Sequence, residues 1–495
     1  MMIEKTPMAF SGWLMGRPIW QMTCQAISLL VIFALCMTNA SYGQGRGGLS
    51  ILRDAEIERT IRHMSEPIFK AAGLDNNSVS TYLINNNSLN AFVAGGQNIF
   101  LHSGLLIQAK DANQVIGVIA HETGHITGGH LSRFSDGIQS ATMMTLIGAI
   151  LGAAAIAAGS GDAGMALILG GQHVGTRTFL KYSRTQESAA DQAGLTFLEK
   201  TGQSGIGLID FLDYLGDQEL MTARYRDPYA GTHPVSGIRI SKLRERVETS
   251  PYFKAKTPAN IEHEFKRLQA KLYGYLKPPY ATLNKFTHKD QGLYARYARA
   301  FAYHKQHDMA KAIGEIDKLL KDYPNDPFFW ETKGQILFEN GLVTDSITPY
   351  RNAVKLIPEA ALIRISLAQS LIATEEDHYL DEALKHLEFS LSRDAKNSFA
   401  WHQASVAYHR KHNAAMTYYA TAERFLLVGN LRGAMINAKH AVDTLPNDIP
   451  QWIRAQDILV VTQSNLSDKE RKKQEKAKKK QQKKTPLVTK QRKKS

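Results

Sequence analysis

The C-terminal half of the chain repeats with a period of 34 residues. Pro324 and Pro358 are separated by this interval, and the residues between them have the small and large apolar spacing of two packed α-helices. Another unit ends at Pro446, and an intermediate unit contains a short insertion at residues 375–378. Each helix pair can bury its apolar side only against neighbouring pairs, so the units must stack. We therefore predict an α-solenoid in this half of the chain.

Apolar residues recur at corresponding positions of these units. Small residues allow the first helix of a pair to approach the second, and large residues fill the space between them. The unit ending at Pro358 has Trp330, Gly334, Leu337, Gly341, Tyr350 and Ala353; the unit ending at Pro446 has Tyr418, Ala422, Phe425, Gly429, Ala434 and Ala441; the intermediate unit has Ala368, Leu371 and Ala383. Trp401 begins a further helix that does not complete a full unit. The period and pattern are those of tetratricopeptide repeats, whose concave surface binds partners.

A length of 495 residues suggests about three domains. A content of 43% hydrophobic and 21% charged residues excludes a wholly disordered or fibrous protein.

Cysteine usage limits the chemistry available to the chain. The only two cysteines, Cys24 and Cys36, lie in one apolar segment near the N-terminus. The rest of the chain therefore has no thiol for a disulfide or a metal site. Any metal must be held by histidines and carboxylates.

The N-terminal segment has the features of an export signal. Residues 26–37 are almost entirely apolar, follow Lys5 and Arg17, and precede small residues. An apolar core of about a dozen residues is short for a membrane span, so we predict a signal peptide over residues 1–43 and a mature protein in the periplasm, either free or associated with a membrane. An uncleaved anchor is the alternative, and lipidation at Cys36 is disfavoured by the bulky residue before it.

The positive charge is concentrated in a C-terminal tail. Residues 469–495 contain 14 Lys or Arg and two Glu, which is +12 of the total net charge of +14. The nearly neutral remainder gives no reason to expect nucleic-acid binding. We predict that residues 466–495 are disordered, because they contain almost no apolar side chains. The tail either increases solubility or contacts anionic lipid headgroups or an acidic partner.

The sequence His121-Glu122-Thr123-Gly124-His125 has the spacing of a zinc site. Residues four apart share a helix face, so both imidazoles can bind one ion. Glu122 can act as the general base toward water and then protonate the leaving amine. The preceding apolar run, residues 114–120, supplies the buried helix that this motif requires. We predict one Zn²⁺ per chain.

A third ligand is needed to leave one coordination position open. His130 follows His125 by five residues, whereas the metzincin pattern requires six, so we interpret it as a helix-end or surface histidine. Glu187 and Asp191 are four apart on a predicted helix with alanines between them. We predict that Glu187 is the third ligand and that Asp191 accepts a hydrogen bond from a ligand imidazole.

His233 and Arg239 are further candidates for the site. His233 is predicted either to stabilise the oxyanion of the tetrahedral intermediate or to fill the open zinc position in a resting state. Arg239 is predicted to orient a neighbouring carboxylate or to stabilise developing charge. The alternative to both roles is a turn histidine before a proline and an exposed helix arginine.

A long uncharged stretch follows the histidine motif. Residues 137–161 contain no formally charged side chain and are rich in Ala, Gly, Met and Ile, and residues 163–176 continue the pattern. Three structures fit it: a transmembrane helix, a hairpin in the membrane interface, or a buried pair of Gly/Ala-rich helices.

The order of these motifs resembles the metallopeptidase family that contains HtpX and the CAAX prenyl protease. The histidine motif, the Glu187/Asp191 pair and His233 before Pro234 follow one another as in that family, and the resemblance covers roughly residues 50–460. Asn90, Ala91 and Phe92, before Gly95-Gly96, look like the family's edge strand. The resemblance implies that these three residues bind extended substrate by backbone pairing.

The resemblance and the repeats together imply a mainly α-helical protein. We expect a gluzincin-type metallopeptidase domain with a small β-sheet at residues 44–285 and the tetratricopeptide solenoid at residues 286–465. The implied function is an envelope zinc endopeptidase that cleaves misfolded or stalled outer-membrane and periplasmic proteins, with the outer-membrane assembly machinery as a partner. Two alternatives are a non-proteolytic chaperone or assembly adaptor acting through the repeats, and an integral-membrane zinc protease.

Overall fold

A small mixed sheet forms the base of the N-terminal domain in the computed structural model, which describes residues 50–75, 78–130, 169, 183–221, 233 and 236–482. The strand order is β1-β2-β4-β3, with β2 parallel and β3 antiparallel to β4. The strands are β1 (Ile51–Leu52), β2 (Ser80–Ile84), β3 (Ala91–Ala94) and β4 (Asn98–His102). Gly95 and Gly96 join β3 to β4 at φ values of 62° and 100°, which glycine adopts without strain. Strand β3 lies at one end of the strand order and is therefore an edge strand of this sheet.

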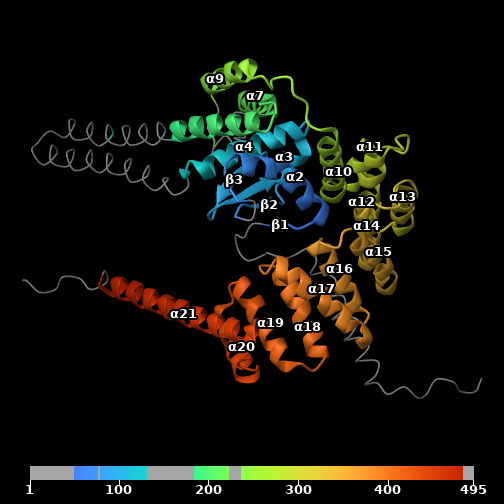
Figure 1. Cartoon of the computed structure of the whole chain (residues 1–495), viewed down its shortest axis with the longest axis vertical. Helices are drawn as coiled ribbons and strands as arrows, with labels where there is room; N and C mark the ends of the chain where they lie inside the picture. The colour runs from blue at the N-terminus through green and yellow to red at the C-terminus, as the bar shows by residue number, and fades with distance from the viewer. Residues whose placement is uncertain are drawn as a thin grey trace, which may run out of the picture. The chain divides into compact units, whose positions relative to one another are not determined.

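Helices pack with this sheet to form the core of the domain (Figure 1). They are α2 (Ala55–Ala71), α3 (Ser103–Gln108), α4 (Ala112–Thr127), a helix covering 183–200, α7 (Ile206–Met221), α9 (Gly237–Thr249) and α10 (Ala259–Leu276). Helix α4 is the central one, because every residue from Ala112 to Gly124 is buried. The Asp111 side chain caps its start by accepting a hydrogen bond from Gln114 N–H at 3.1 Å. The predicted helix before the histidine motif is confirmed.

Glycines allow the neighbouring helices to approach α4 closely. A Cβ atom at Gly124 would lie 2.5 Å from the carbonyl oxygen of Ala190, and one at Gly194 would lie 3.0 Å from the carbonyl carbon of Ala120. The helix covering 183–200 therefore crosses α4 at nearly backbone contact. This crossing brings two distant sequence motifs together.

The C-terminal half forms five antiparallel helix pairs, as the repeat period predicts. After the short α11 (Pro279–Lys285), the pairs are α12 (Leu293–Lys305) with α13 (Met309–Asp322), α14 (Pro327–Glu339) with α15 (Val343–Leu356), α16 (Ala361–Ala373) with α17 (Leu380–Arg393), α18 (Ser398–Arg410) with α19 (Ala414–Leu427), and α20 (Leu431–Thr444) with α21 (Pro450–Gln482). A Cβ at Gly334 would meet the Tyr350 ring at 2.9 Å. The predicted pairing of small with large residues is thus confirmed at these positions.

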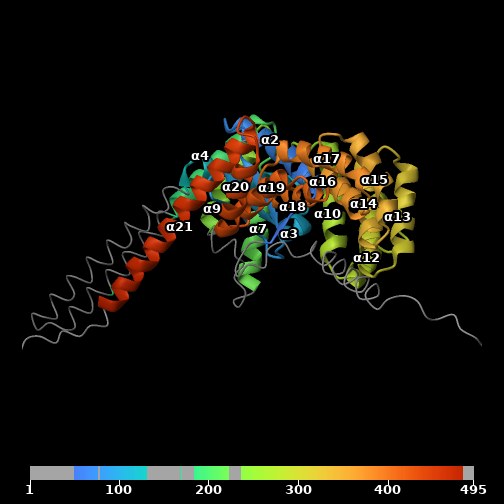
Figure 2. The ribbon, with the colours of Figure 1, turned by 90° about the horizontal axis from the view of Figure 1, so that it is seen from below.

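Two expectations about the repeat region are wrong. The helix that contains Trp401, α18, does form a complete repeat unit, because it packs against α19. The rings of Trp401 and Tyr419 meet edge to face, with their centroids 5.4 Å apart. Helix α21 is one continuous helix to Gln482 (Figure 2), although we expected disorder from residue 466. Residues 467–482 contain neither Gly nor Pro and are mostly Lys, Arg, Gln, Glu and Ala, which are strong helix formers. Residues 483–495 lie outside the described part of the chain.

Two predicted segments lie outside the described residues. The predicted signal peptide, residues 1–43, lies outside the described residues, and so does the uncharged stretch 137–176 except for Leu169. Among the helices that are described, none combines the length and the hydropathy needed to cross a bilayer.

Candidate metal centre

Helix α4 presents two imidazoles on one face. The Nε2 atoms of His121 and His125 are 3.1 Å apart, as expected for residues one helical turn apart. His121 is fully buried and His125 is partly buried. Both metal-binding nitrogens therefore point into the space under the crossing helix.

The helix covering 183–200 places Glu187 opposite these imidazoles. Its Oε2 lies 3.4 Å from His121 Nε2, and its Oε1 lies 3.4 Å from His125 Nε2. The carboxylate is buried at 4% exposure. The structure therefore brings together the two stretches that the sequence analysis paired, 62 residues apart along the chain.

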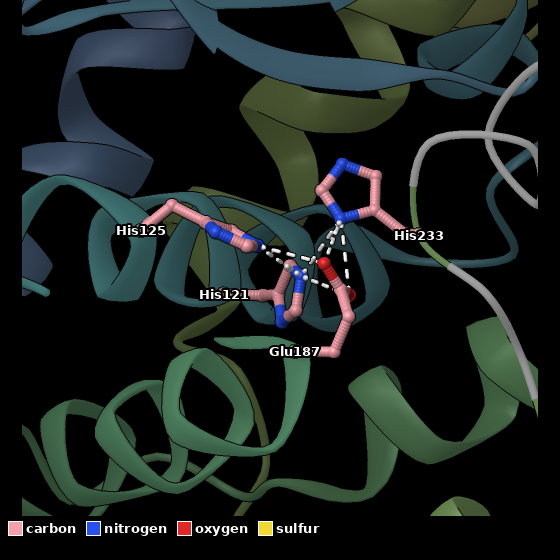
Figure 3. A group of neighbouring side chains, drawn as sticks. All are labelled: His121, His125, Glu187 and His233. Carbon is pink, nitrogen blue, oxygen red and sulfur yellow. Dashed lines mark hydrogen bonds and ion pairs between the residues drawn. The ribbon is translucent and has the colours of Figure 1, made fainter. Parts of the chain in front are cut away.

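His233 closes the cluster from a third segment (Figure 3). Its Nδ1 lies 3.3 Å from His121 Nε2 and 3.1 Å from each Glu187 oxygen. All four residues offer donor atoms within 4.8 Å of one another. Tetrahedral donors at zinc bond lengths of about 2.0–2.1 Å would stand about 3.3–3.4 Å apart. The observed separations of 3.1–3.4 Å match this spacing, and the nitrogen and oxygen donors are those that zinc prefers.

Glu187 keeps a negative charge inside the cluster. Burial alone would raise the pKa of Glu187, but the charge of His233 and hydrogen bonds from His121 and His125 hold it far below its ordinary range. Burial lowers the pKa of His121, whereas Asp191 and Glu187 outweigh burial and raise it to about 10. Without metal, the carboxylate thus keeps its charge and a proton on His121 balances part of it. A metal ion can take over this compensation.

Glu122 is a fully buried carboxylate whose two oxygens have no hydrogen-bond partner among the described residues. Its Oε1 is 3.5 Å from His233 Nε2. A buried carboxylate that accepts no hydrogen bond is costly, so such a group in a native site indicates a role toward a further molecule. Water or a substrate amine beside the metal ligands would supply the missing donor.

Asp191 and Arg239 contact the ligand side chains His121 and Glu187 and hold them in position. Asp191 Oδ1 lies 2.9 Å from His121 Nδ1, the nitrogen directed away from the cluster. Arg239 binds Asp191 through Nε and Nη2 at 2.6 and 2.7 Å, and its Nη1 lies 3.1 Å from Glu187 Oε2. Ser236 caps α9 by accepting a hydrogen bond from Arg239 N–H at 3.3 Å. Of the two roles predicted for Arg239, this geometry favours orientation of carboxylates.

One of the two sequence interpretations of His130, a helix-end or a surface histidine, is wrong. His130 is buried at 8% exposure, and its Nδ1 lies 2.9 Å from Nδ1 of His125, so the expectation of a surface histidine is wrong. Gly129 has a φ of 59°, and a Cβ at Gly128 would come within 2.4 Å of His130 Nε2. The Gly128-Gly129 pair, which lets the chain turn back onto α4, is the sequence signal that could have indicated this contact.

The predicted substrate strand lies beside the metal-bearing helix. Strand β3 contacts α4 and pairs only with β4 among the described strands. The Phe92 ring stacks on the Phe100 ring, with the two centroids 5.1 Å apart, and this contact stabilises the hairpin of β3 and β4. Asn90 is buried, and its Oδ1 has no hydrogen-bond partner in the described part of the chain. One edge of β3 is thus unpaired within the sheet that the structure describes.

Part of the chain, including most of this site, matches a family of known sequences. Residues 52–247 match the sequence model of Peptidase family M48. M48 metallopeptidases depend on zinc, and the His and Glu cluster of this chain supplies the donors that such an ion needs. The chain is therefore a zinc metalloprotease with a helical-repeat region after its peptidase domain.

Several curated proteins are similar to this chain. The "Beta-barrel assembly-enhancing protease" of Escherichia coli (strain K12) is 26% identical over 410 residues, which is 79% of this chain and 80% of that protein. The protein of the same name from Yersinia pestis is 26% identical over 329 residues, 64% of this chain and 66% of its own length. "Metalloprotease YcaL" of Escherichia coli (strain K12) is 29% identical over 163 residues, 32% of this chain and 58% of that protein.

Proposed function

We propose that this metalloprotease is an endopeptidase of the bacterial envelope that cleaves misfolded or stalled outer-membrane and periplasmic proteins. The observation that carries the proposal is Glu122, a fully buried carboxylate whose oxygens accept no hydrogen bond from the described residues and which lies next to four side chains that could hold a metal ion. Similarity to proteases named for β-barrel assembly supports the class of substrate. The apolar N-terminal segment supports export to the periplasm.

The side chains have separate roles in peptide hydrolysis. His121, His125 and Glu187 would hold the ion, and a zinc ion in such a site activates water and polarises the substrate carbonyl. Glu122 accepts the proton of the attacking water and returns it to the leaving amine. Asp191 keeps the His121 proton on Nδ1, so that Nε2 remains free to bind metal. Buried surroundings strengthen each of these interactions.

His233 has a different role in the closed arrangement seen here. Four protein donors would leave no open position on a bound ion, whereas a catalytic zinc site keeps one for water or substrate. We propose that His233 occupies the fourth position in a resting state and moves away when substrate binds. Its alternative role, stabilising the oxyanion, requires the same movement away from the Glu187 carboxylate.

Substrate selection is assigned to two surfaces. We propose that an extended segment of the client pairs with the edge strand β3 at Asn90, Ala91 and Phe92. The helical repeats recruit the client and connect the protease to the outer-membrane assembly machinery.

The basic segment 469–495 contacts anionic lipid headgroups. Binding of the protein to anionic vesicles should weaken as the salt concentration rises, and salt-independent binding would contradict this contact.

The test of the proteolytic role is the conservative variant Glu122→Gln. It should keep one zinc per chain but lose at least about a hundredfold in cleavage of casein, because general-base catalysis of this kind contributes 10²–10⁴-fold. Glu199→Gln, on the helix covering 183–200 and paired with Arg246 at 2.9 Å, is the matched control and should retain activity. Wild-type cleavage by the Glu122→Gln protein would remove the catalytic assignment.

A non-proteolytic adaptor role is a second candidate, and the four-donor arrangement of the zinc site favours it. A closed site is typical of structural zinc, and the repeats can bind partners without cleavage. If this role dominates, cells with Glu122→Gln will assemble their outer membrane normally, whereas cells lacking residues 292–458 will not. Equal assembly defects in both strains would assign the function to proteolysis.

A further inference from the structure

We infer that His130 is a positioning residue that accepts a hydrogen bond from Nδ1–H of the metal ligand His125. This inference rests on the proposed metal-binding role of His125. It gives His125 a partner equivalent to the one that Asp191 provides for His121. It also gives a reason for the turn that brings His130 back onto α4.

The distances distinguish the two nitrogens of His125. Its Nε2 faces the cluster, 3.1 Å from His121 Nε2 and 3.4 Å from Glu187 Oε1. Its Nδ1 faces the opposite way, 2.9 Å from His130 Nδ1, with the two rings inclined at 78°. His130 is therefore not one of the metal donors, and it lies where it can determine which nitrogen of His125 carries the proton.

The direction of this hydrogen bond follows from the chemistry of a metal-bound imidazole. A neutral histidine that binds metal through Nε2 carries its proton on Nδ1. Because both nitrogens at this contact are Nδ1 atoms, His130 must offer a lone pair and keep its own proton on Nε2. A His130 protonated at Nδ1 would place two N–H groups against each other and turn the His125 ring away.

A neutral acceptor also suits the charge of the site. Among the residues that the structure describes, the buried charged groups around the cluster are the carboxylates of Glu122, Glu187 and Asp191 and the guanidinium of Arg239. With a divalent cation bound, their formal charges cancel. A fourth carboxylate at position 130 would leave an uncompensated buried charge, which is unfavourable, whereas an imidazole orients the ligand without adding charge.

The experiment compares His130→Asn with His130→Leu, two side chains of similar size and shape. The Asn amide oxygen can accept the hydrogen bond from His125, and the Leu side chain cannot. We expect His130→Asn to bind zinc with nearly wild-type affinity. We expect His130→Leu to bind zinc about 10–100-fold more weakly, the usual effect of losing an outer partner of a ligand histidine.

The readouts are zinc dissociation constants from chelator competition and the visible absorption spectrum of the Co²⁺-substituted protein. His63→Leu is the control, since it removes a histidine bound to Glu264 at 2.7 Å and should change neither quantity. Equal zinc affinities and identical Co²⁺ spectra for the Asn and Leu variants would overturn the role of His130. Failure of the wild-type protein to bind zinc would instead contradict the metal centre itself.

Discussion

Arg239 connects two carboxylates of the metal centre through one side chain. It is paired with Asp191 by two hydrogen bonds and with Glu187 by a third contact. Burial would raise the pKa of Asp191, but hydrogen bonds from Arg239 and His121 lower it below its ordinary value. Asp191 therefore remains a carboxylate that can hold the His121 imidazole in one orientation.

Replacing Arg239 with Lys tests this connection. An ammonium group cannot form the planar pair of hydrogen bonds to Asp191, so we expect zinc affinity to fall about tenfold, at the lower end for outer partners of metal ligands. Chelator competition gives the affinity. Arg246→Lys, on the same helix α9, is the control because Arg246 pairs with Glu199 away from the cluster. Equal zinc affinities of the two variants would contradict the orienting role.

Sequence reasoning found the residues of the centre more readily than their relationships. His121 and His125 followed from helix periodicity, and Glu187 followed from the need for a third ligand. The partner of Arg239 could not be inferred, because its role depends on which carboxylate the start of α9 faces. The spacing of His130 predicts correctly that it is not a metal donor, but it cannot predict burial of the ring, because the Gly128-Gly129 turn determines where the ring lies.

At the scale of elements, the metal centre depends on one helix crossing. Gly124 allows the helix covering 183–200 to lie against α4, and its Cβ would meet the backbone oxygen of Ala190 at 2.5 Å. A backbone atom cannot rotate away as a side chain can. Any added volume must therefore separate the two helices that carry the donors.

The Gly124→Ala variant measures the importance of this close approach. We expect a loss of stability of about 1–3 kcal/mol from overpacking, together with weaker zinc binding, because Glu187 moves away from both imidazoles. Gly216→Ala is the matched control on α7, where an added Cβ meets nothing within 4 Å. The measurements are the melting temperature and the zinc dissociation constant. A Gly124→Ala protein with both values unchanged would show that the crossing can relax.

The elements most accurately predicted were those with strong periodicity. The repeat helices and α4 follow directly from the spacing of their apolar residues. Helix α21 shows the limit of this approach: absence of apolar residues predicted disorder, but intrinsic helix propensity extends the helix to Gln482.

At the scale of the whole molecule, a buried polar network joins the peptidase domain to the first repeat helices. Glu56 of α2 accepts a hydrogen bond from Tyr297 of α12 at 2.7 Å and pairs with Arg267 and Lys271 of α10 at 2.7 and 3.3 Å. Arg267 also binds Asp326 before α14. Buried pairs of this kind are costly to disrupt singly, so the two regions should unfold together.

Glu331 of α14 makes this junction sensitive to pH. Its carboxyl group lies 3.9 Å from Lys271, and burial, with Asp54, Glu56 and Asp326 nearby, raises its pKa from 4.5 to about 8. The folded protein therefore binds a proton that the unfolded chain has lost between these pH values. The free energy of unfolding should decrease as pH rises from about 4.5 to about 8, and this contribution should be constant above that range.

The Glu331→Gln variant should lack this pH dependence, because the amide cannot ionise. Its melting temperature relative to wild type should increase between pH 5 and pH 8.5, as the wild-type carboxyl group loses its proton. Thermal unfolding at several pH values measures the difference. Glu359→Gln replaces an exposed carboxylate of the repeats and serves as the control. A difference between Glu331→Gln and wild type that stays constant across this range would contradict the raised pKa.

Metal analysis of Glu187→Ala tests most directly whether two separated stretches of the chain hold one zinc ion. The comparison includes the wild-type protein and Glu199→Ala, which removes a carboxylate from the same helix outside the cluster. We predict one zinc per chain and casein cleavage for the wild-type protein and Glu199→Ala, and loss of both for Glu187→Ala. Stoichiometric zinc bound to Glu187→Ala with wild-type affinity would contradict the proposed metal centre.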